Sequence, residues 1–237
     1  MVLIDWNDLP REMQTEEVRK YYSILQGKTA TLTVKRGFDI IASLLLLSVF
    51  FPAFLCLSLA IRLDSEGPVF YRQERVTQYG KIFRIHKFRS MVSDADKKGS
   101  LVTVRNDARV TKVGAFIRKY RLDEIPQLID ILEGNMSFVG TRPEVPKYVE
   151  KYTPEMLATL LIPAGVTSEA SIQYKDENKL LDAADDVDKV YIEQVLPGKM
   201  AYNLMSLENL SLGSDFLTML RTVLAVLGMD FGGESDK

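Results

Sequence analysis

The dominant feature of the chain is one uninterrupted apolar run. Residues 40–61 read IIASLLLLSVFFPAFLCLSLAI, without a single charge. At a rise of 1.5 Å per residue, a straight helix of this length reaches about 33 Å, enough for a hydrocarbon core of about 30 Å. A buried core helix is rarely apolar on every face for so long. A cleavable signal peptide fits poorly, because a charged amphipathic segment precedes the run. The run predicts membrane association.

Two topologies fit this run. A single straight span is the simplest interpretation of its length. However, Lys35 and Arg36 precede it and Arg62 follows it, so positive charge marks both ends, whereas basic residues favour the cytoplasmic side. Pro52 lies past the middle, where it frees a backbone carbonyl and kinks the helix. Ser48 can bond a carbonyl one turn back. A helix that enters, bends at this break and returns to the same face accounts for both features.

The segment before the run predicts one amphipathic helix. It begins at Pro10, carries Tyr21, Tyr22 and Leu25, and stops at Gly27. Such a helix either packs on the rest of the chain or contacts a second copy in a homo-oligomer.

A final helix is expected over residues 216–227, after Ser214 and Asp215 as its cap. Arg221 is its only charge. The helix must therefore pack on a partner surface or lie in the membrane interface.

The middle of the chain mixes short strand and helix patterns. Strands are expected at 69–71 and 82–85, and helices over 121–134 and part of 143–161. The fold class is therefore mixed α/β. The expected division is an amphipathic extension (1–34), a membrane helix (35–62), a catalytic domain (63–200) and C-terminal interfacial helices (201–237).

Composition excludes several classes of protein. The chain has 237 residues with 30 Lys+Arg against 32 Asp+Glu, so it lacks the basic excess of a general nucleic-acid binder. One cysteine, Cys56, excludes an intrachain disulfide or a multi-cysteine zinc site. The single histidine, His86, lies in an alternating pattern and is expected to pack. Residues 94–100, DADKKGS, are expected to form a solvated loop or a frayed helix end. An acidic patch, Asp182, Asp185, Asp186 and Asp188, is expected to be a solvated face and not a metal site.

Asp123 and Glu124 are the first candidates for chemistry. Pro126 is tolerated only in a first helical turn, so the helix over 121–134 should begin close to Asp123. The positive end of the helix dipole would keep these carboxylates ionised, as a nucleophile or as ligands for a hard cation. An N-cap followed by an acidic first-turn residue explains the pair equally well.

Basic residues surround this pair in the sequence. They are Arg72, Arg75, Lys81, Arg84, Lys87 and Arg89, then Arg109, Arg118, Lys119 and Arg121, with Arg142 after a glycine turn. Guanidinium groups and turn amides bind phosphate oxygens well. The pattern favours phosphorylated lipid or nucleotide substrates over nucleic acid. A surface patch that attracts anionic lipid is the alternative.

Six motifs in order resemble the bacterial sugar transferase family, the monotopic phosphoglycosyl transferases. They are KRGFD (35–39), GPVF (67–70), KFRSM (87–91), NDAR (106–109), LDEIPQL (122–128) and GNMSFVGTRP (134–143). The resemblance covers about residues 35–160. It implies a membrane-associated monotopic mixed α/β fold, with a re-entrant helix broken at Ser48 and Pro52 and interfacial amphipathic helices.

The resemblance also implies a reaction and its residues. Asp123 would attack the β-phosphate of a UDP-sugar and release UMP, and polyprenyl (undecaprenyl) phosphate would then accept the sugar phosphate. Glu124 would work with Mg²⁺, so that both carboxylates are expected at the metal. The substrate-binding residues would be Lys87, Arg89, Arg118, Gln127 and Arg142. The enzyme would act at the cytoplasmic face of the bacterial inner membrane. The alternatives are a single-displacement transferase and a non-enzymatic membrane-anchored adaptor that binds anionic lipid.

The chain departs from the family pattern in two places. Residues 163–172 read PAGVTSEASI, where the family commonly has Arg-Pro-Gly-Ile-Thr-Gly followed by Trp-Ala-Gln-Val. Thr141 stands where a proline is common. Both changes concern recognition of the nucleotide and the sugar.

Overall fold

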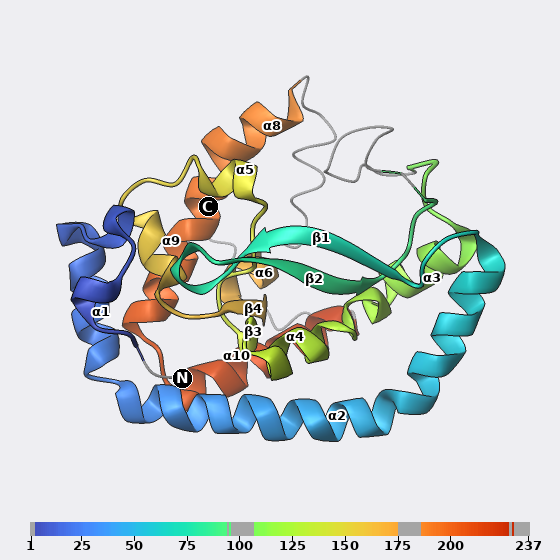
Figure 1. Cartoon of the computed structure of the whole chain (residues 1–237), viewed down its shortest axis with the longest axis horizontal. Helices are drawn as coiled ribbons and strands as arrows, with labels where there is room; N and C mark the ends of the chain where they lie inside the picture. Colours follow the sequence, from blue (N-terminus) through green and yellow to red (C-terminus); the bar gives the residue numbers. More distant parts are fainter. Residues whose placement is uncertain (1–2, 94, 96–106, 175–185, 228, 230–237) are drawn as a thin grey trace.

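The protein is a mixed α/β molecule in which helices predominate (Figure 1). The computed structural model describes residues 3–93, 95, 107–174, 186–227 and 229. The mixed α/β class is confirmed, together with one long apolar helix near the N-terminus. Residues 94 and 96–100 of the expected solvated loop, together with Asp182 and Asp185 of the acidic patch, lie outside the described residues. The α-helices are α1 (Glu16–Gln26), α2 (Thr29–Asp64), α3 (Lys112–Lys119), α4 (Gln127–Glu133), α5 (Pro146–Val149), α6 (Glu169–Gln173), α8 (Val187–Val190), α9 (Leu196–Glu208) and α10 (Leu212–Val226).

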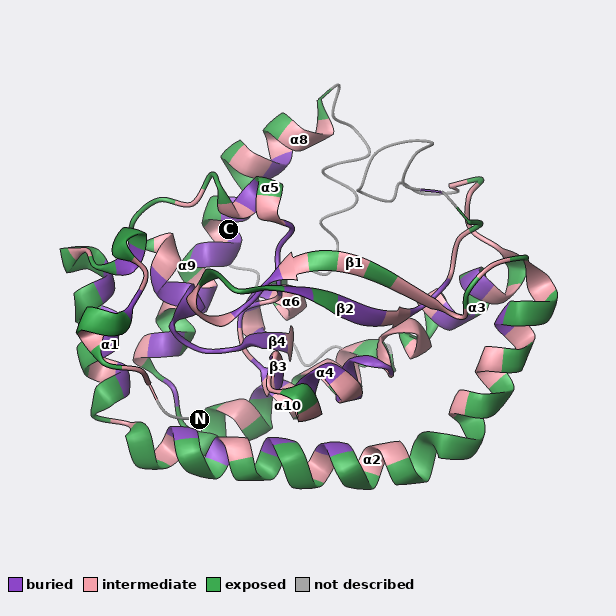
Figure 2. Ribbon diagram, in the orientation of Figure 1, coloured by how far each residue is buried: buried purple, intermediate pink, exposed green. Residues whose placement is uncertain are grey.

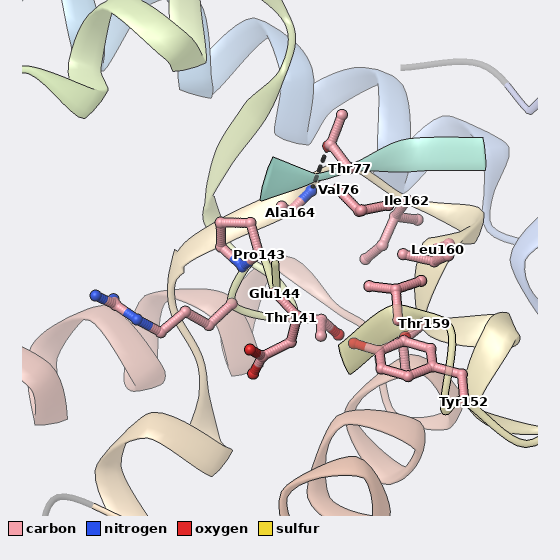
Figure 3. Close-up of a pocket in the computed structure, with 12 residues that line it drawn as sticks. Val76, Thr77, Thr141, Pro143, Glu144, Tyr152, Thr159, Leu160, Ile162 and Ala164 are labelled. Carbon is pink, nitrogen blue, oxygen red and sulfur yellow. Dashed lines mark hydrogen bonds between the residues drawn. The ribbon is translucent and has the colours of Figure 1, made fainter. Parts of the chain in front are cut away.

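Two small sheets occupy the centre. β1 (Phe70–Val76) pairs antiparallel with β2 (Ile82–Phe88), and β3 (Met136–Val139) pairs parallel with β4 (Ala164–Thr167). Both predicted strands are confirmed, although each is longer than its apolar run. Thr77 joins the two sheets: its Oγ1 accepts from Ala164 N at 3.1 Å (Figure 3) and donates to the Asn135 carbonyl at 2.5 Å.

The predicted apolar helix is α2, which runs along one edge of the molecule and then bends toward α3 (Figure 1). It is long and apolar enough to cross a membrane, and only 6% of its most apolar 18-residue window is buried in protein. Figure 2 shows its exposed surface. α2 begins at Thr29, so the expected boundary at residue 35 falls inside one continuous helix.

Pro52 and Ser48 lie inside α2 as the sequence predicts. Ser48 Oγ donates to the Leu44 carbonyl at 2.9 Å, one turn back. The carbonyl that Pro52 deprives of its usual donor is that of Ser48 itself. The Ser48 hydroxyl therefore bonds a carbonyl one turn before the break and does not satisfy the freed carbonyl, so the expectation that it would do so was wrong.

One end of α2 is fixed to the last turn of α4. Arg36 donates to the carbonyls of Ile131 at 2.6 Å and Leu132 at 3.0 Å. Gly134 ends α4 in the left-handed conformation, with φ 84°, and its N–H donates to the Ile131 carbonyl at 3.0 Å, so Arg36 adds a second donor to a carbonyl of the last turn. The guanidinium therefore caps α4 while it anchors the apolar helix.

The N-terminal extension packs on the body of the protein. The expected helix is present as α1, but it begins at Glu16 with Thr15 as its cap, and residues 11–13 form a separate 3₁₀ turn. Pro10 precedes that turn, so the expected start was wrong. Tyr21, Tyr22 and Leu25 are buried in a cluster with residues of α9 and of the 3₁₀ helix Met156–Leu161. The packing alternative is confirmed.

The last helix, α10, begins earlier than expected. Its cap is Ser211, and Ser211 and Ser214 bond reciprocally in a capping box. Ser214 and Asp215 therefore lie inside the helix, and Asp215 is a second charge beside Arg221. Lys35 of α2 donates to Asp215 at 2.6 Å, which holds α10 against the apolar helix. The exposed apolar residues of α10 include Phe216, Leu217, Leu220, Val223 and Val226.

Candidate active site

The acid pair lies in a turn just before α4. After α3 the chain passes through Arg121, whose φ of 56° is left-handed, and then forms the 3₁₀ turn Leu122–Glu124. The predicted helix over 121–134 is therefore two elements, and α4 starts only at Gln127, after Pro126 as its N-cap. A left-handed conformation is costly for a residue with a Cβ, by about 1–2 kcal/mol. This costly backbone conformation occurs at Arg121, two residues before Asp123.

Glu124 lies among three basic side chains. Lys87 Nζ of β2 is 3.2 Å from Glu124 Oε1. Arg142 donates to both carboxylate oxygens, through Nη2 to Oε1 and through Nη1 to Oε2 at 3.5 Å. Arg121 Nη1 lies 3.8 Å from Oε1. Residues remote in the sequence thus converge on one carboxylate.

These contacts set the charge of the site. Burial alone would raise the pKa of Glu124, but Arg142 and Lys87 outweigh it and hold the pKa well below its ordinary value. The Glu124 carboxylate in turn raises the pKa of Arg142 against the effect of burial. Burial lowers the pKa of Lys87 despite Glu124, and the charge of Arg142 adds to this effect. Glu124 is therefore an anion throughout the physiological range of pH.

Asp123 differs from its neighbour. Burial and the charge of Glu124 raise its pKa above the ordinary value, and Lys87 and Arg118 only partly oppose this. The sequence predicted a carboxylate kept ionised by the end of a helix dipole, whereas in the structure Asp123 lies one turn before α4 and desolvation is the largest influence on its pKa. A less stabilised carboxylate is a stronger base and a better nucleophile.

A pocket of about 410 Å³ opens beside Glu124 and Arg142. Its polar end also includes Lys119 and Arg121. Its apolar walls come from several elements: Leu46 and Phe50 of α2, Ile125 and Leu128, Phe138 and Val166, Ile172, and Ala225 and Val226 of α10. The pocket therefore joins a charged end to the apolar surface that α2 and α10 expose.

Three of the predicted substrate-binding residues do not contact Glu124. Arg89 is buried and donates to the carbonyls of Ile61, Ser65 and Glu66 at the end of α2, so it caps that helix. Gln127 is buried in the first turn of α4, and its amide has no hydrogen-bond partner among the described residues. Arg118, at the end of α3, is near enough to lower the pKa of Asp123. The structure brings together Asp123, Glu124, Lys87 and Arg142.

Two other arginines support the site without having been assigned to it. Arg121 contacts Glu124 directly, as described above. Arg75 donates through Nη1 to the Pro143 carbonyl at 3.0 Å and through Nη2 to Gln73 Oε1 at 2.5 Å, which fixes the turn that presents Arg142. The sequence did place Arg75 in the same group of basic residues as Lys87, and this was the available indication that Arg75 lies near the site. His86 packs as predicted, bonded to Asp130.

Comparison with known proteins places this geometry in one family. The model of the family described as bacterial sugar transferase matches residues 30–229. The chain is 33% identical over 197 residues, 82% of its length, to an Aeromonas hydrophila UDP-N-acetylgalactosamine-undecaprenyl-phosphate N-acetylgalactosaminephosphotransferase. It is 38% identical over 169 residues, 68% of its length, to an Escherichia coli UDP-glucose:undecaprenyl-phosphate glucose-1-phosphate transferase, and 33% identical over 199 residues, 83% of its length, to a Caulobacter vibrioides protein of the same name.

The protein belongs to the bacterial sugar transferase family. Its predicted class, a phosphoglycosyl transferase enzyme associated with a membrane, is thereby confirmed. The chain spans 44% and 36% of the first two relatives and 70% of the third.

Proposed function

We propose that the protein transfers a sugar 1-phosphate from a UDP-sugar to polyprenyl phosphate by a covalent, two-step route. In the first step an oxygen of Asp123 attacks the β-phosphorus, the bond from that phosphorus to the bridging oxygen breaks, and UMP leaves. In the second step an oxygen of polyprenyl phosphate attacks the same phosphorus, and the Asp123 carboxylate leaves. The products are UMP and a polyprenyl diphosphate sugar.

The observation that carries this proposal is the contrast between two adjacent carboxylates. The negative charge of Glu124 is balanced by the positive charges of Arg142 and Lys87. Asp123, in contrast, is desolvated and has a raised pKa. Adjacent acids in different environments are suited to different roles. Asp123 is the nucleophile, and the basic groups around Glu124 reduce the repulsion between the incoming diphosphate and the carboxylates.

The donor set fits Mg²⁺, which prefers carboxylate oxygens. Glu124 Oε2 has Arg142 Nη1 at 3.5 Å as its nearest recorded donor, a weak contact that leaves acceptor capacity. Asp123 and Glu124 would hold the ion. When bound, Mg²⁺ supplies positive charge that offsets the negative charge of the diphosphate.

The pocket supports a lipid acceptor. Its charged end suits a phosphate group, and its walls from α2 and α10 suit an isoprenoid tail. The relatives are named for undecaprenyl phosphate, and we assign this class of acceptor to the present chain. Both substrates would then meet at the membrane surface.

We infer that α2 is re-entrant and that the active site lies at the cytoplasmic face of the inner membrane. Arg36, near one end of α2, caps α4, and Arg89 binds the carbonyls of the other end. Both ends thus contact the domain that holds the acid pair. The bend of α2 (Figure 1), the presence of Pro52 inside this helix and the basic residues at both flanks support the same topology.

Release of UMP without acceptor tests the reaction. The purified protein is incubated with Mg²⁺ and, in turn, UDP-N-acetylgalactosamine, UDP-glucose and UDP-galactose. The covalent route predicts stoichiometric UMP release before undecaprenyl phosphate is added, and turnover afterwards. UMP release that strictly requires the lipid would instead support a single displacement.

A further inference from the structure

Besides apolar packing of Phe83 and Ile85 against Leu128 and Ile131, two polar contacts join strand β2 to the segment that carries the acid pair. The first is the ion pair of Lys87 with Glu124. The second involves the preceding residue of β2 and lies on α4: Asp130 Oδ2 accepts from the His86 backbone N–H at 2.8 Å, and Asp130 Oδ1 lies 2.8 Å from His86 Nδ1. The Asp130 side chain is fully buried, and His86 is 8% exposed.

Asp130 takes the place of a neighbouring strand at this edge of β2. Among the residues that the structure describes, β2 pairs with β1 alone, with His86 opposite Arg72. The His86 N–H faces α4, and a buried amide without a partner is costly. Because both carboxylate oxygens bind one residue, they fix the separation of β2 from α4 and also the rotation of His86.

We propose that the His86–Asp130 pair is a positioning device that sets Lys87 against Glu124. Lys87 directly follows His86 on β2, and the turn that carries Glu124 leads into the helix that carries Asp130. A shift of β2 along α4 would therefore separate the Lys87 ammonium from the Glu124 carboxylate. His86 and Asp130 act through Lys87 and do not contact substrate.

Glu133 provides a matched control on the same helix. Its carboxylate lies within 4.8 Å of the ligand atoms of His86 and Asp130, so the three could be mistaken for a metal site. Both Asp130 oxygens are already bonded to His86, however, and Glu133 is exposed and accepts from the Asn135 side chain at 3.0 Å. Glu133→Gln should leave activity unchanged.

The test is a double-mutant cycle on UMP release, and this readout rests on the proposed function. Asp130→Ala should lower kcat by about 10- to 100-fold with KM for the UDP-sugar nearly unchanged, as for other residues that orient a catalytic group. In a Lys87→Met background the same change should cost almost nothing further, because its effect passes through Lys87. Asp130→Asn, which keeps an acceptor for the His86 N–H, should restore most of kcat. Losses that multiply independently would overturn the proposal.

Two further measurements cover the remaining outcomes. If Asp130→Ala does not fold, His86→Phe replaces it in the cycle, since it removes the ring contact and keeps the backbone bond. If the wild-type protein releases UMP from no UDP-sugar, the proposed function fails, and the cycle is read in the melting temperature instead. Coupled losses for Asp130→Ala and Lys87→Met would still support the positioning device, and additive losses would reject it.

Discussion

The Arg142 guanidinium donates hydrogen bonds to both carboxylate oxygens of Glu124, and its Nη1 also donates to the Val166 carbonyl at 3.2 Å. One side chain thus ties the turn after β3 both to the acid pair and to β4. Replacing Arg142 should therefore change both the catalytic rate and the dependence of protein stability on pH.

Replacing Arg142 with methionine should lower kcat/KM by about 10²- to 10³-fold, the usual loss when one donor to a reacting oxyanion is removed. Steady-state assays with a UDP-sugar and undecaprenyl phosphate measure this effect. Arg72→Met is the matched control, because Arg72 is exposed and donates only to the Arg84 carbonyl among the contacts described for it. Equal losses in the two variants would remove Arg142 from the site.

The same variant should change acid stability in a defined direction. The pKa of Glu124 is lowered in the folded state, so its contribution to stability is present above the ordinary value of 4.5 and is lost as pH falls toward the folded-state pKa. The difference in melting temperature between wild type and Arg142→Met should be constant above about pH 5.5 and should shrink below pH 4.5. A difference that grows on acidification would contradict this assignment.

Asp123→Asn should be at least as stable as the wild type at pH 7. Burial and Glu124 raise the pKa of Asp123, so this group favours folding below its ordinary value of 3.8, and that contribution is lost as pH rises through the folded-state pKa. Asparagine removes the buried charge. Melting temperatures across pH measure the effect, and the advantage of the variant should vanish near pH 4. A variant less stable than wild type at pH 7 would show that other contacts of Asp123 dominate.

Sequence patterns predicted the elements of this fold better than their exact ends. The local pattern of apolar and polar residues predicted the apolar helix, both strands of the β1–β2 pair and α1. Burial of one face of an element, or exposure of a helix to lipid, sets this pattern within a short stretch of sequence. The motif around Asp123 also indicated the family. The pKa of Asp123 could not be predicted, since it depends on desolvation by residues distant in the chain. The contacts of Arg89 could not be predicted for a related reason: a basic residue in such a motif looks the same in sequence whether it faces a ligand or caps a helix.

The role of Arg89 as a helix cap predicts a defect in stability. Arg89→Ala should cost about 3 kcal/mol, because several carbonyls at the end of α2 lose a charged donor. Gly67→Ala should act in the same direction, since Gly67 has φ 123° and an added Cβ would lie 2.1 Å from Arg89 Nη1. Gly37→Ala, which meets no atom within 4 Å inside α2, is the control and should be neutral or stabilising. Thermal unfolding in detergent compares the three, and an unaffected Arg89→Ala would refute the cap.

The re-entrant topology predicts that cysteines placed at the two ends of α2 are accessible to a labelling reagent from the same side of the membrane. After Cys56→Ser, single cysteines are placed at Thr31 and Ser65, and intact cells are treated with an impermeant maleimide. Both positions should stay protected until the cells are opened. Labelling of Thr31→Cys from outside, with Ser65→Cys protected, would establish a straight span.

The covalent adduct tests the central claim most directly. The protein is incubated with Mg²⁺ and a reactive UDP-sugar, without lipid, then quenched in acid and analysed by peptide mass spectrometry. A sugar phosphate should be found on the peptide that contains Asp123, with one equivalent of UMP released, and the adduct should disappear on addition of undecaprenyl phosphate. Asp123→Asn should give no adduct and lose at least about a thousandfold in kcat, whereas Glu133→Gln should match wild type. An enzyme that turns over with its lipid acceptor yet forms no adduct, or an Asp123→Asn variant with wild-type kcat, would contradict the account.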